Sequence, residues 1–220
     1  MVRNLRDHMF AGFLLACLAV FMSGPTLADD TNDASSPPKK GDQWTYDWTD
    51  LTTNAPAATT AYTVTETTET DFTVSVEKLG SGPGWLLTFD SNWNVKQDNL
   101  WSSRPGDGLG FQFPLKVGKS WTVNGTNKNL QNGAVFRHKG NSKVVSEEKI
   151  QTSAGEFEAF KVVSDLKWLA TNGGGLKSEI HAETWYAPQI NCIVKRSFIS
   201  RLGGHVQSSY STELTDNSPN

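Results

Sequence analysis

One stretch of the sequence places ionisable side chains at a spacing that could support chemistry. Glu179, His181 and Glu183 alternate with other residues and are followed by Trp185. In a β-strand, alternate residues share a face and lie ~6.8 Å apart, which is twice the rise per residue. Two carboxylates beside an imidazole would raise the pKa of His181, and the set could act in hydrolysis or bind a metal ion.

The same spacing is also typical of a solvated sheet face. Three ligands on one straight strand do not converge easily on a coordination shell of ~2 Å radius. The sequence contains no G-x-S-x-G, H-E-x-x-H or C-x-x-C motif. We therefore favour a solvated face, expect neither a metal nor a cofactor, and keep His181, Glu179 and Glu183 as weak catalytic candidates.

The eight Trp residues are the second chemical signal. Indole offers a large apolar area with one donor, so exposed Trp could stack on sugars or line a cavity for acyl chains. Core packing is the interpretation that we favour for most of them. Trp93 and Trp101 fall in a predicted turn and a polar loop, so we expect both to lie outside the core. They are the candidate ligand-binding residues.

A turn is also the favoured interpretation of the segment around Trp93. Asp90, Asn92 and Asn94 have the spacing that opens a calcium loop. Such a loop needs Gly at position six and Glu at position twelve, and these positions hold Val95 and Trp101. We predict a hairpin turn instead.

Composition excludes one class of partner. The chain has 220 residues, 37% hydrophobic content and a formal net charge of −3. This mildly acidic balance, without long basic runs, argues against nucleic acid. The length is typical of one all-β domain.

The N-terminus predicts export. Residues 1–28 have a basic start at Arg3 and Arg6, an apolar segment over 9–22 and a small-residue cleavage site ending at Ala28. The apolar segment is shorter than the ~20 residues of a transmembrane helix. We expect cleavage after Ala28 and a periplasmic location. Attachment as a lipoprotein through Cys17 is the less favoured alternative, because cleavage there would leave an apolar rather than a polar tether.

The mature chain is expected to consist of three parts. We predict a disordered linker over 29–40, a single β-domain over 41–216 and a tail over 217–220. Without residues 1–28 the only cysteine is Cys192, so no internal disulfide can form. We interpret Cys192 as a strand thiol rather than a nucleophile.

Alternation of apolar and polar residues predicts strands through most of this domain. The connections between them are short, with a polar segment at 51–58 and turns at 140–141 and 203–204. Connections this short require antiparallel pairing. We expect an antiparallel meander with little helix that forms a half-barrel or a barrel, with a sandwich left open. The predicted strands span 44–48, 61–65, 72–77, 85–89, 94–97, 120–124, 134–139, 143–151, 157–169, 176–186, 193–202 and 206–214.

The last turn also predicts a register. A two-residue turn at Gly203 and Gly204 pairs residues whose numbers sum to 407. This would place Ile199 opposite Ser208 and Ile193 opposite Leu214.

Three motifs resemble those of a family of exported bacterial β-proteins of unknown function. They are P-L-x-x-G-x-x-W at 114–121, A-G-x-F-x-A-x-K-V at 154–162, and W-Y-A-P at 185–188 followed by Ile193-Val-Lys. The resemblance covers about residues 41–214 and implies a twisted antiparallel sheet, related to the half-barrels of periplasmic lipid and lipoprotein carriers. It implies no catalytic residues. Asn191 stands where the family corner has Gly, and Asn tolerates the positive φ that this corner needs.

Three functions follow, in order of preference. The first is a periplasmic, non-enzymatic binding or accessory protein that holds a lipid-like or small apolar ligand on the concave face of its sheet. The second is a structural or interaction module of a cell-envelope complex, with an envelope protein as its partner. The third is a hydrolase or carbohydrate-active enzyme that uses His181.

Overall fold

The computed structural model describes residues 37–171 and 177–219. The predicted signal peptide, its cleavage site, Cys17 and most of the predicted linker lie outside these residues. The strands, with one short 3-10 helix η1 (Pro188–Ile190), are β1 (Gln43–Asp50), β2 (Ala55–Thr67), β3 (Asp71–Lys78), β4 (Trp85–Asp90), β5 (Val95–Gln97), β6 (Trp101–Arg104), β7 (Ser120–Asn129), β8 (Val135–Thr152), β9 (Gly155–Ala170), β10 (Lys177–Ala187), β11 (Cys192–Leu202) and β12 (His205–Ser218).

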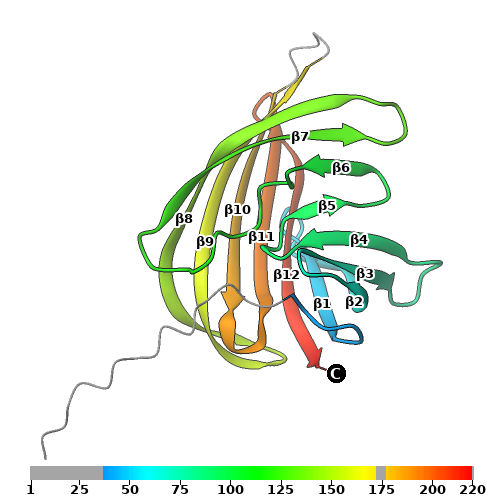
Figure 1. The fold of residues 1–220 in the computed structure, drawn as a ribbon, viewed down its shortest axis with the longest axis vertical. Coiled ribbons are helices and arrows are strands. Elements are labelled where there is room, and N and C mark those ends of the chain that lie inside the picture. Colours follow the sequence, from blue (N-terminus) through cyan, green and yellow to red (C-terminus); the bar gives the residue numbers. More distant parts are fainter. Residues whose placement is uncertain (1–36, 172–176, 220) are drawn as a thin grey trace, which may run out of the picture. The chain divides into compact units, whose positions relative to one another are not determined.

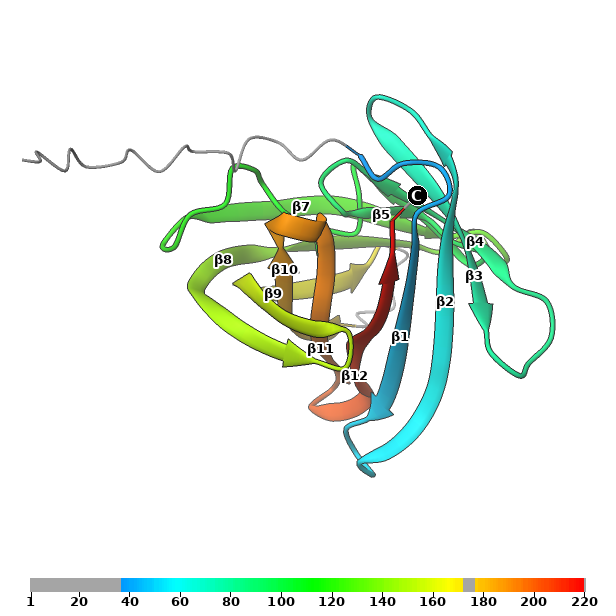
Figure 2. The same ribbon diagram turned by 90° about the horizontal axis from the view of Figure 1, so that it is seen from below.

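These strands form one closed antiparallel barrel (Figures 1 and 2). Each strand pairs with the strands before and after it in sequence, and β1 pairs with β12 to close the ring. The predicted all-β antiparallel meander is confirmed, and it closes as a barrel rather than a half-barrel or a sandwich. In the described part of the chain η1 is the only helix, and no helix there has the length and apolarity to cross a membrane.

Every second side chain along each strand points inward, and these side chains fill the barrel. Along β10, Ile180, Ala182 and Thr184 are buried while Glu179 and His181 on the other face are not. Inward-facing residues from around the ring build one large apolar cluster and a smaller one around Leu166 and Ile180. A period of two with one dry face is the pattern from which the strands were predicted.

The connection between β6 and β7 crosses the barrel and completes its core (Figure 1). Leu109 packs against residues of β7, β9 and β10, and Phe111 contacts the Tyr186 ring at 5.0 Å. The backbone is held by hydrogen bonds from Phe111 N to Asn92 O and from Asp107 N to Val95 O. This connection therefore acts as an internal plug, and we call residues 105–119 the plug loop.

The predicted turn at Gly140 and Asn141 is wrong, because β8 runs without interruption from Val135 to Thr152. Gly140 pairs with Leu166 of β9, and a Cβ on Gly140 would collide with the carbonyl oxygen of Asp165. The glycine is needed for close approach of two strands rather than for a turn. Two other predicted boundaries move as well, since β2 begins at Ala55 inside the expected polar connection and Trp101 begins a strand rather than lying in a loop.

The predicted register of the last hairpin holds only next to the turn. Leu202 pairs with His205 and Arg201 with Val206, which sum to 407. The register then shifts between Ser200 and Arg201, so that Ile199 pairs with Ser209 rather than Ser208. A β-bulge adds one residue to one strand, and a turn-based rule cannot anticipate it.

The corner between β10 and β11 agrees with expectation. Asn191 has φ 47° and ψ 49°, which is the left-handed conformation, and its N–H donates to Pro188 O at 3.1 Å. Its side-chain oxygen accepts a hydrogen bond from the Tyr186 hydroxyl at 2.8 Å. Asn thus takes the place of Gly at this turn without breaking it.

Candidate functional site

An aromatic cavity lies inside the barrel. Its volume is about 80 Å³, and its wall comes from β1, β2, β4, β11, β12 and the turn after β4. Seven aromatic side chains and one cationic side chain surround it. The lining residues are Trp44, Tyr46, Trp48, Tyr62, Phe89, Trp93, Ile193, Arg196, Tyr210 and Thr212.

Alternation on β1 supplies one wall of this cavity. Trp44, Tyr46 and Trp48 share one face of the strand, as the sequence indicated. Neighbouring strands add rings beside them: Tyr62 lies 5.3 Å from Tyr46 and Tyr210 lies 4.8 Å from Trp48, measured between ring centroids. Contacts of this kind fix the rings relative to one another and shape the cavity.

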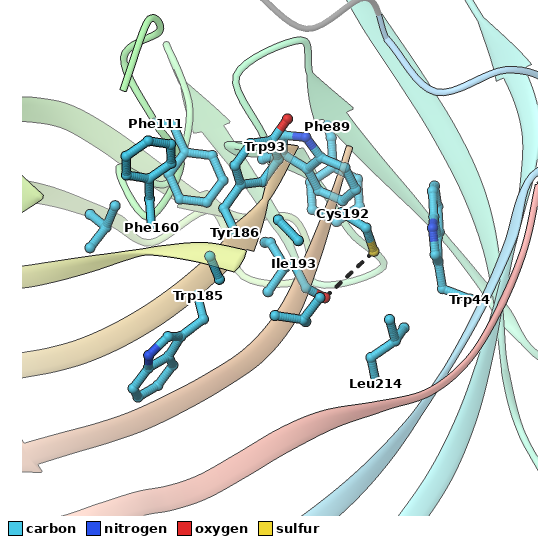
Figure 3. Packing of buried hydrophobic residues seen from close by; sticks show 14 of the residues in the cluster. Trp44, Phe89, Trp93, Phe111, Phe160, Trp185, Tyr186, Cys192, Ile193 and Leu214 are labelled. Atoms are coloured by element: carbon cyan, nitrogen blue, oxygen red, sulfur yellow. Dashed lines mark hydrogen bonds between the residues drawn. The ribbon is translucent and has the colours of Figure 1, made fainter. Parts of the chain in front are cut away.

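Trp93 lies in the core, so the expectation that it stays outside is wrong. It is 4% exposed and lies beside Phe89 (Figure 3). Its ring also contacts those of Trp44 at 5.6 Å and Phe72 at 5.1 Å. The turn explains its position: Asp90 accepts hydrogen bonds from the N–H groups of Asn92 and Asn94, and Trp93 takes φ 63°. This backbone directs the indole inward, where Trp93 lines the cavity.

Arg196 brings the only cationic group among the lining residues. Its Nε donates to the Thr184 hydroxyl at 3.1 Å and its Nη2 to Leu109 O of the plug loop at 3.4 Å. Asp107 of the plug loop accepts hydrogen bonds from the N–H groups of Val95 and Leu109, both at 3.1 Å. Burial raises the pKa of Asp107 to about 6, although the nearby Arg196 charge opposes this rise.

Cys192 is buried in the core beside Tyr46, which lines the aromatic cavity. Its thiol lies 3.1 Å from the Tyr46 hydroxyl, which donates to Ile193 O at 2.8 Å. Burial raises the pKa of Cys192 to about 12 and also raises that of Tyr46. A thiol that remains protonated at neutral pH is a poor nucleophile, so the geometry agrees with the interpretation of Cys192 as a structural residue.

Trp101 lies inside the barrel away from the aromatic cavity. Its ring contacts Phe136 at 5.5 Å and Trp168 at 6.2 Å. Around it, β7, β8 and β9 contribute Asn127, His138 and Trp168, whose side chains contain buried polar atoms with no hydrogen-bond partner among the described residues. We call these three residues the polar cluster.

The polar cluster is also tightly packed. His138 lies over Gly125 of β7, where a Cβ would collide with its Nε2. Burial lowers the pKa of His138, so the imidazole is neutral near pH 7. A second cavity, which is polar and has a volume of about 130 Å³, adjoins the polar cluster. It is lined in part by His138, Asn94 and Gln112.

The predicted set around His181 lies on the outer face of β10. His181 Nδ1 contacts Asp165 of β9 at 2.8 Å, while its Nε2 is 3.9 Å from Glu183. Glu183 lies 3.0 Å from Lys161, and Glu179 pairs with Lys177 instead. The structure thus joins His181 to a carboxylate that the sequence did not indicate. No group of three or more potential metal ligands occurs among the described residues.

Trp185 continues this outer face. In Figure 3 its indole points to the opposite side from the ring of Tyr186. The indole N–H donates to Glu148 at 2.7 Å, and the Lys161 ammonium lies 4.8 Å from the ring centroid. These contacts cover the ring, so that Trp185 is only 8% exposed although it lies on the outer face of the strand.

Sequence reasoning missed Arg196 and Asp107. Arg196 follows Lys195, and only the pairing of Thr184 with Arg196 shows which of these two cations faces inward. Asp107 lies in a glycine-rich connection that looks like a plain loop. The one signal of a cavity in the sequence was the aromatic face of β1. Three aromatic side chains on one face require apolar residues on the neighbouring strands.

Comparison with known proteins adds a fold relationship. A sequence model of the Cna protein B-type domain matches residues 26–85. This is less than half of the chain, and the described part of the match contributes β1, β2, β3 and the first residue of β4 to the barrel. No curated protein matches the chain in sequence.

Two solved structures are similar to the barrel. A candidate lipoprotein from Parabacteroides distasonis ATCC 8503 has a TM-score of 0.52 and 12% identity, and the alignment covers 83% of this chain and 97% of that one. A candidate exported protein with a YmcC-like fold from Bacteroides fragilis NCTC 9343 has a TM-score of 0.54 and 13% identity, with 83% and 98% covered. At these identities the likeness establishes a shared fold.

Proposed function

We propose that this chain is an exported, non-enzymatic binding protein that holds an apolar ligand inside its barrel. The observation that carries the proposal is the aromatic cavity, where seven rings from several strands surround one space. Concave sites lined by aromatic side chains with few polar groups are the usual form of small-molecule sites.

The cavity volume limits what enters. About 80 Å³ exceeds the ~10–15 Å³ that one water molecule needs but is below the ~300 Å³ at which drug-sized pockets begin. A small apolar group fits this space, such as one ring or the end of an acyl chain. The ligand is therefore a molecule that inserts one apolar end between Trp44, Trp48 and Trp93.

Export is supported from two directions. The N-terminal sequence has the pattern of a signal peptide, and both similar structures are candidate exported or lipid-attached proteins. We propose a periplasmic location after cleavage behind Ala28. Mass determination of the mature protein from its host tests this point, because attachment through Cys17 would give a longer, acylated chain.

Ligand binding is tested with a cavity-filling variant. Thr212 lines the cavity, and its neighbour Ser211 on β12 faces the other way. Thr212→Phe should abolish uptake of a fluorescent fatty acid, whereas Ser211→Phe should leave it unchanged. Extraction of the purified protein should release a bound apolar molecule from the native chain only. Absence of uptake and of extracted material would refute the proposal.

A second candidate function is an interaction module of a cell-envelope complex. In β4, Trp85, Leu86 and Leu87 pair with β3, while pairing with β5 involves only Thr88 and Phe89 among the described residues. This leaves a short strand edge of the kind to which an extended partner segment can add, with Leu86 59% exposed beside it. Crosslinking from position 86 in envelope extracts should capture one stoichiometric partner if this function holds. An equal yield from an outward-facing position on β9, such as Lys167, would contradict it.

A further inference from the structure

We infer that the ligand of the aromatic cavity is an amphipathic monoanion, with Arg196 binding its acidic head group. This inference rests on the proposed function and names the chemical class of its ligand. It goes beyond an apolar ligand because it requires one negative charge at a fixed place beside the rings.

The first argument is the free hydrogen-bonding capacity of Arg196. The guanidinium has five N–H donors, and its hydrogen bonds to described residues use two of them, toward Thr184 and Leu109. These two contacts hold the side chain in place. The remaining donors belong to a residue that lines the cavity, so they are available to a group bound there.

The second argument is charge. No carboxylate oxygen among the described residues lies within 4.0 Å of the Arg196 guanidinium. The other polar groups of the cavity wall are the Tyr46, Tyr62 and Tyr210 phenols, the Trp indoles and the Thr212 hydroxyl. A cation in surroundings this apolar is costly unless an anion pairs with it. Asp107 interacts with Arg196 electrostatically but without a direct ion pair, so a bound acid would supply the direct partner.

Asp107 bears on whether the ligand head group carries one negative charge or two. Its carboxylate is near enough to interact electrostatically with Arg196 and with Tyr210. A ligand head with two charges would meet repulsion from Asp107 as well as attraction from Arg196. A head with one charge, such as a carboxylate, makes the same two-point hydrogen bonds to a guanidinium with less repulsion. The structure therefore favours a carboxylic acid over a phosphate monoester.

The ligand body is defined by the same cavity. Trp44, Trp48 and Trp93 offer apolar faces that suit an alkyl chain or a ring. Because Arg196 and these indoles line one space, a single molecule can contact both. Medium-chain fatty acids and aryl-substituted acids have this combination.

The test compares an acid with its alcohol on the full chain. Decanoate and decanol have the same apolar body and differ in charge. Titration at pH 7.5 by calorimetry and Trp fluorescence should show decanoate binding at least about tenfold more tightly, as expected for charge-assisted hydrogen bonds. Arg196→Met should abolish the preference for the acid, so that decanoate and decanol bind this variant with similar affinity. Arg196→Lys should retain part of the preference, and decyl phosphate should bind more weakly than decanoate.

The outcomes separate the two proposals. Equal affinity for acid and alcohol in the native protein would overturn the role of Arg196 while leaving an apolar binding site in place. Absence of binding of either compound would overturn the proposed function itself. The native comparison needs no variant, so poor folding of Arg196→Met cannot obscure the result. Asp107→Asn should strengthen decanoate binding, and weakened binding in this variant would also contradict the inference.

Discussion

The two halves of the barrel interior are built by the same strand alternation but from different side chains. Around the aromatic cavity, the Tyr46 hydroxyl and the Trp48 indole N–H find hydrogen-bond partners at 2.8 Å. In the polar cluster, Asn127 is fully buried and neither polar atom of its side chain has a partner among the described residues. The aromatic region leaves one buried polar atom, the Trp93 indole nitrogen, without a partner among the described residues, whereas the polar cluster leaves four.

This difference indicates how the two regions contribute to stability. Buried rings contribute through apolar burial and close contact, whereas an unpaired buried polar group costs roughly 1–3 kcal/mol. We therefore expect the aromatic half to stabilise the barrel and the polar cluster to reduce its stability.

The largest effect should follow loss of a ring beside the aromatic cavity. Phe72 is 1% exposed and stacks on Phe89 at 5.0 Å. Phe72→Ala should lower the free energy of unfolding by about 3–5 kcal/mol, because it removes apolar contact and leaves a cavity. Phe136→Ala, at a half-buried ring beside the polar cluster, should cost clearly less. Equal losses in denaturant unfolding would mean that the two halves do not differ.

The second-largest effect should be a pH dependence of stability that arises from Asp107. Its folded pKa of about 6 lies above the ~3.9 of an unfolded aspartate. The folded protein therefore binds this proton more tightly, so the contribution of Asp107 to stability is complete below about pH 4 and is lost as pH rises toward 6 and above. Allowing for its partial exposure, the loss should be about 2 kcal/mol.

Asp107→Asn should remove this pH dependence and stabilise the protein at pH 7, as measured by denaturant unfolding at several pH values. Asp50 provides a control of opposite sign. Hydrogen bonds from the N–H groups of Thr53 and Thr52 lower the pKa of Asp50, so its contribution is present near neutral pH and is lost on acidification. Identical pH profiles for Asp107→Asn and the native protein would contradict the prediction.

The polar cluster should respond in the opposite direction to the aromatic half. Asn127→Leu replaces a buried amide with an apolar side chain of similar size and removes unpaired polar atoms. We expect the free energy of unfolding to rise by about 1 kcal/mol. The control is Ser142→Ala, which breaks the buried hydrogen bond between Ser142 and Ser164 at 2.8 Å and should destabilise. A stability loss in Asn127→Leu would show that its amide makes favourable interactions.

The smallest effect should come from outside the barrel. His181→Ala removes a partly exposed contact with Asp165, and exposed ion pairs contribute roughly 0–1 kcal/mol. We expect less than about 0.5 kcal/mol, and ligand binding equal to that of the native protein. Loss of a hydrolytic activity in this variant, with stability unchanged, would instead support the third hypothesis of a catalytic His181.

Much of the fold could be predicted because its rules are local. Period-two alternation located the strands, and short connections required antiparallel neighbours. The errors arose where local rules fail. Gly140 looks like a turn residue until β9 is known to lie against it, and the register of β11 and β12 depends on a bulge that leaves no mark in the sequence.

The cavity was harder to predict than the sheet. Trp93 points inward only because the turn at Asp90 gives it a positive φ. Arg196 and Asp107 approach each other across 89 positions of sequence (196 − 107), through a plug loop with no regular structure. These residues come close together only when the whole barrel closes. The sequence pattern of single strands does not predict such long-range contacts.

Closure itself has a further consequence. The first and last strands are neighbours, with Gln43 opposite Ser218, so the two ends of the barrel chain emerge side by side. A circular permutant that links these ends and opens between Gly203 and Gly204 would retain every strand pairing while changing their order of synthesis. In the native order the β1–β12 seam can form only after the entire barrel sequence has left the ribosome. The permutant would turn that last-formed seam into an ordinary local hairpin.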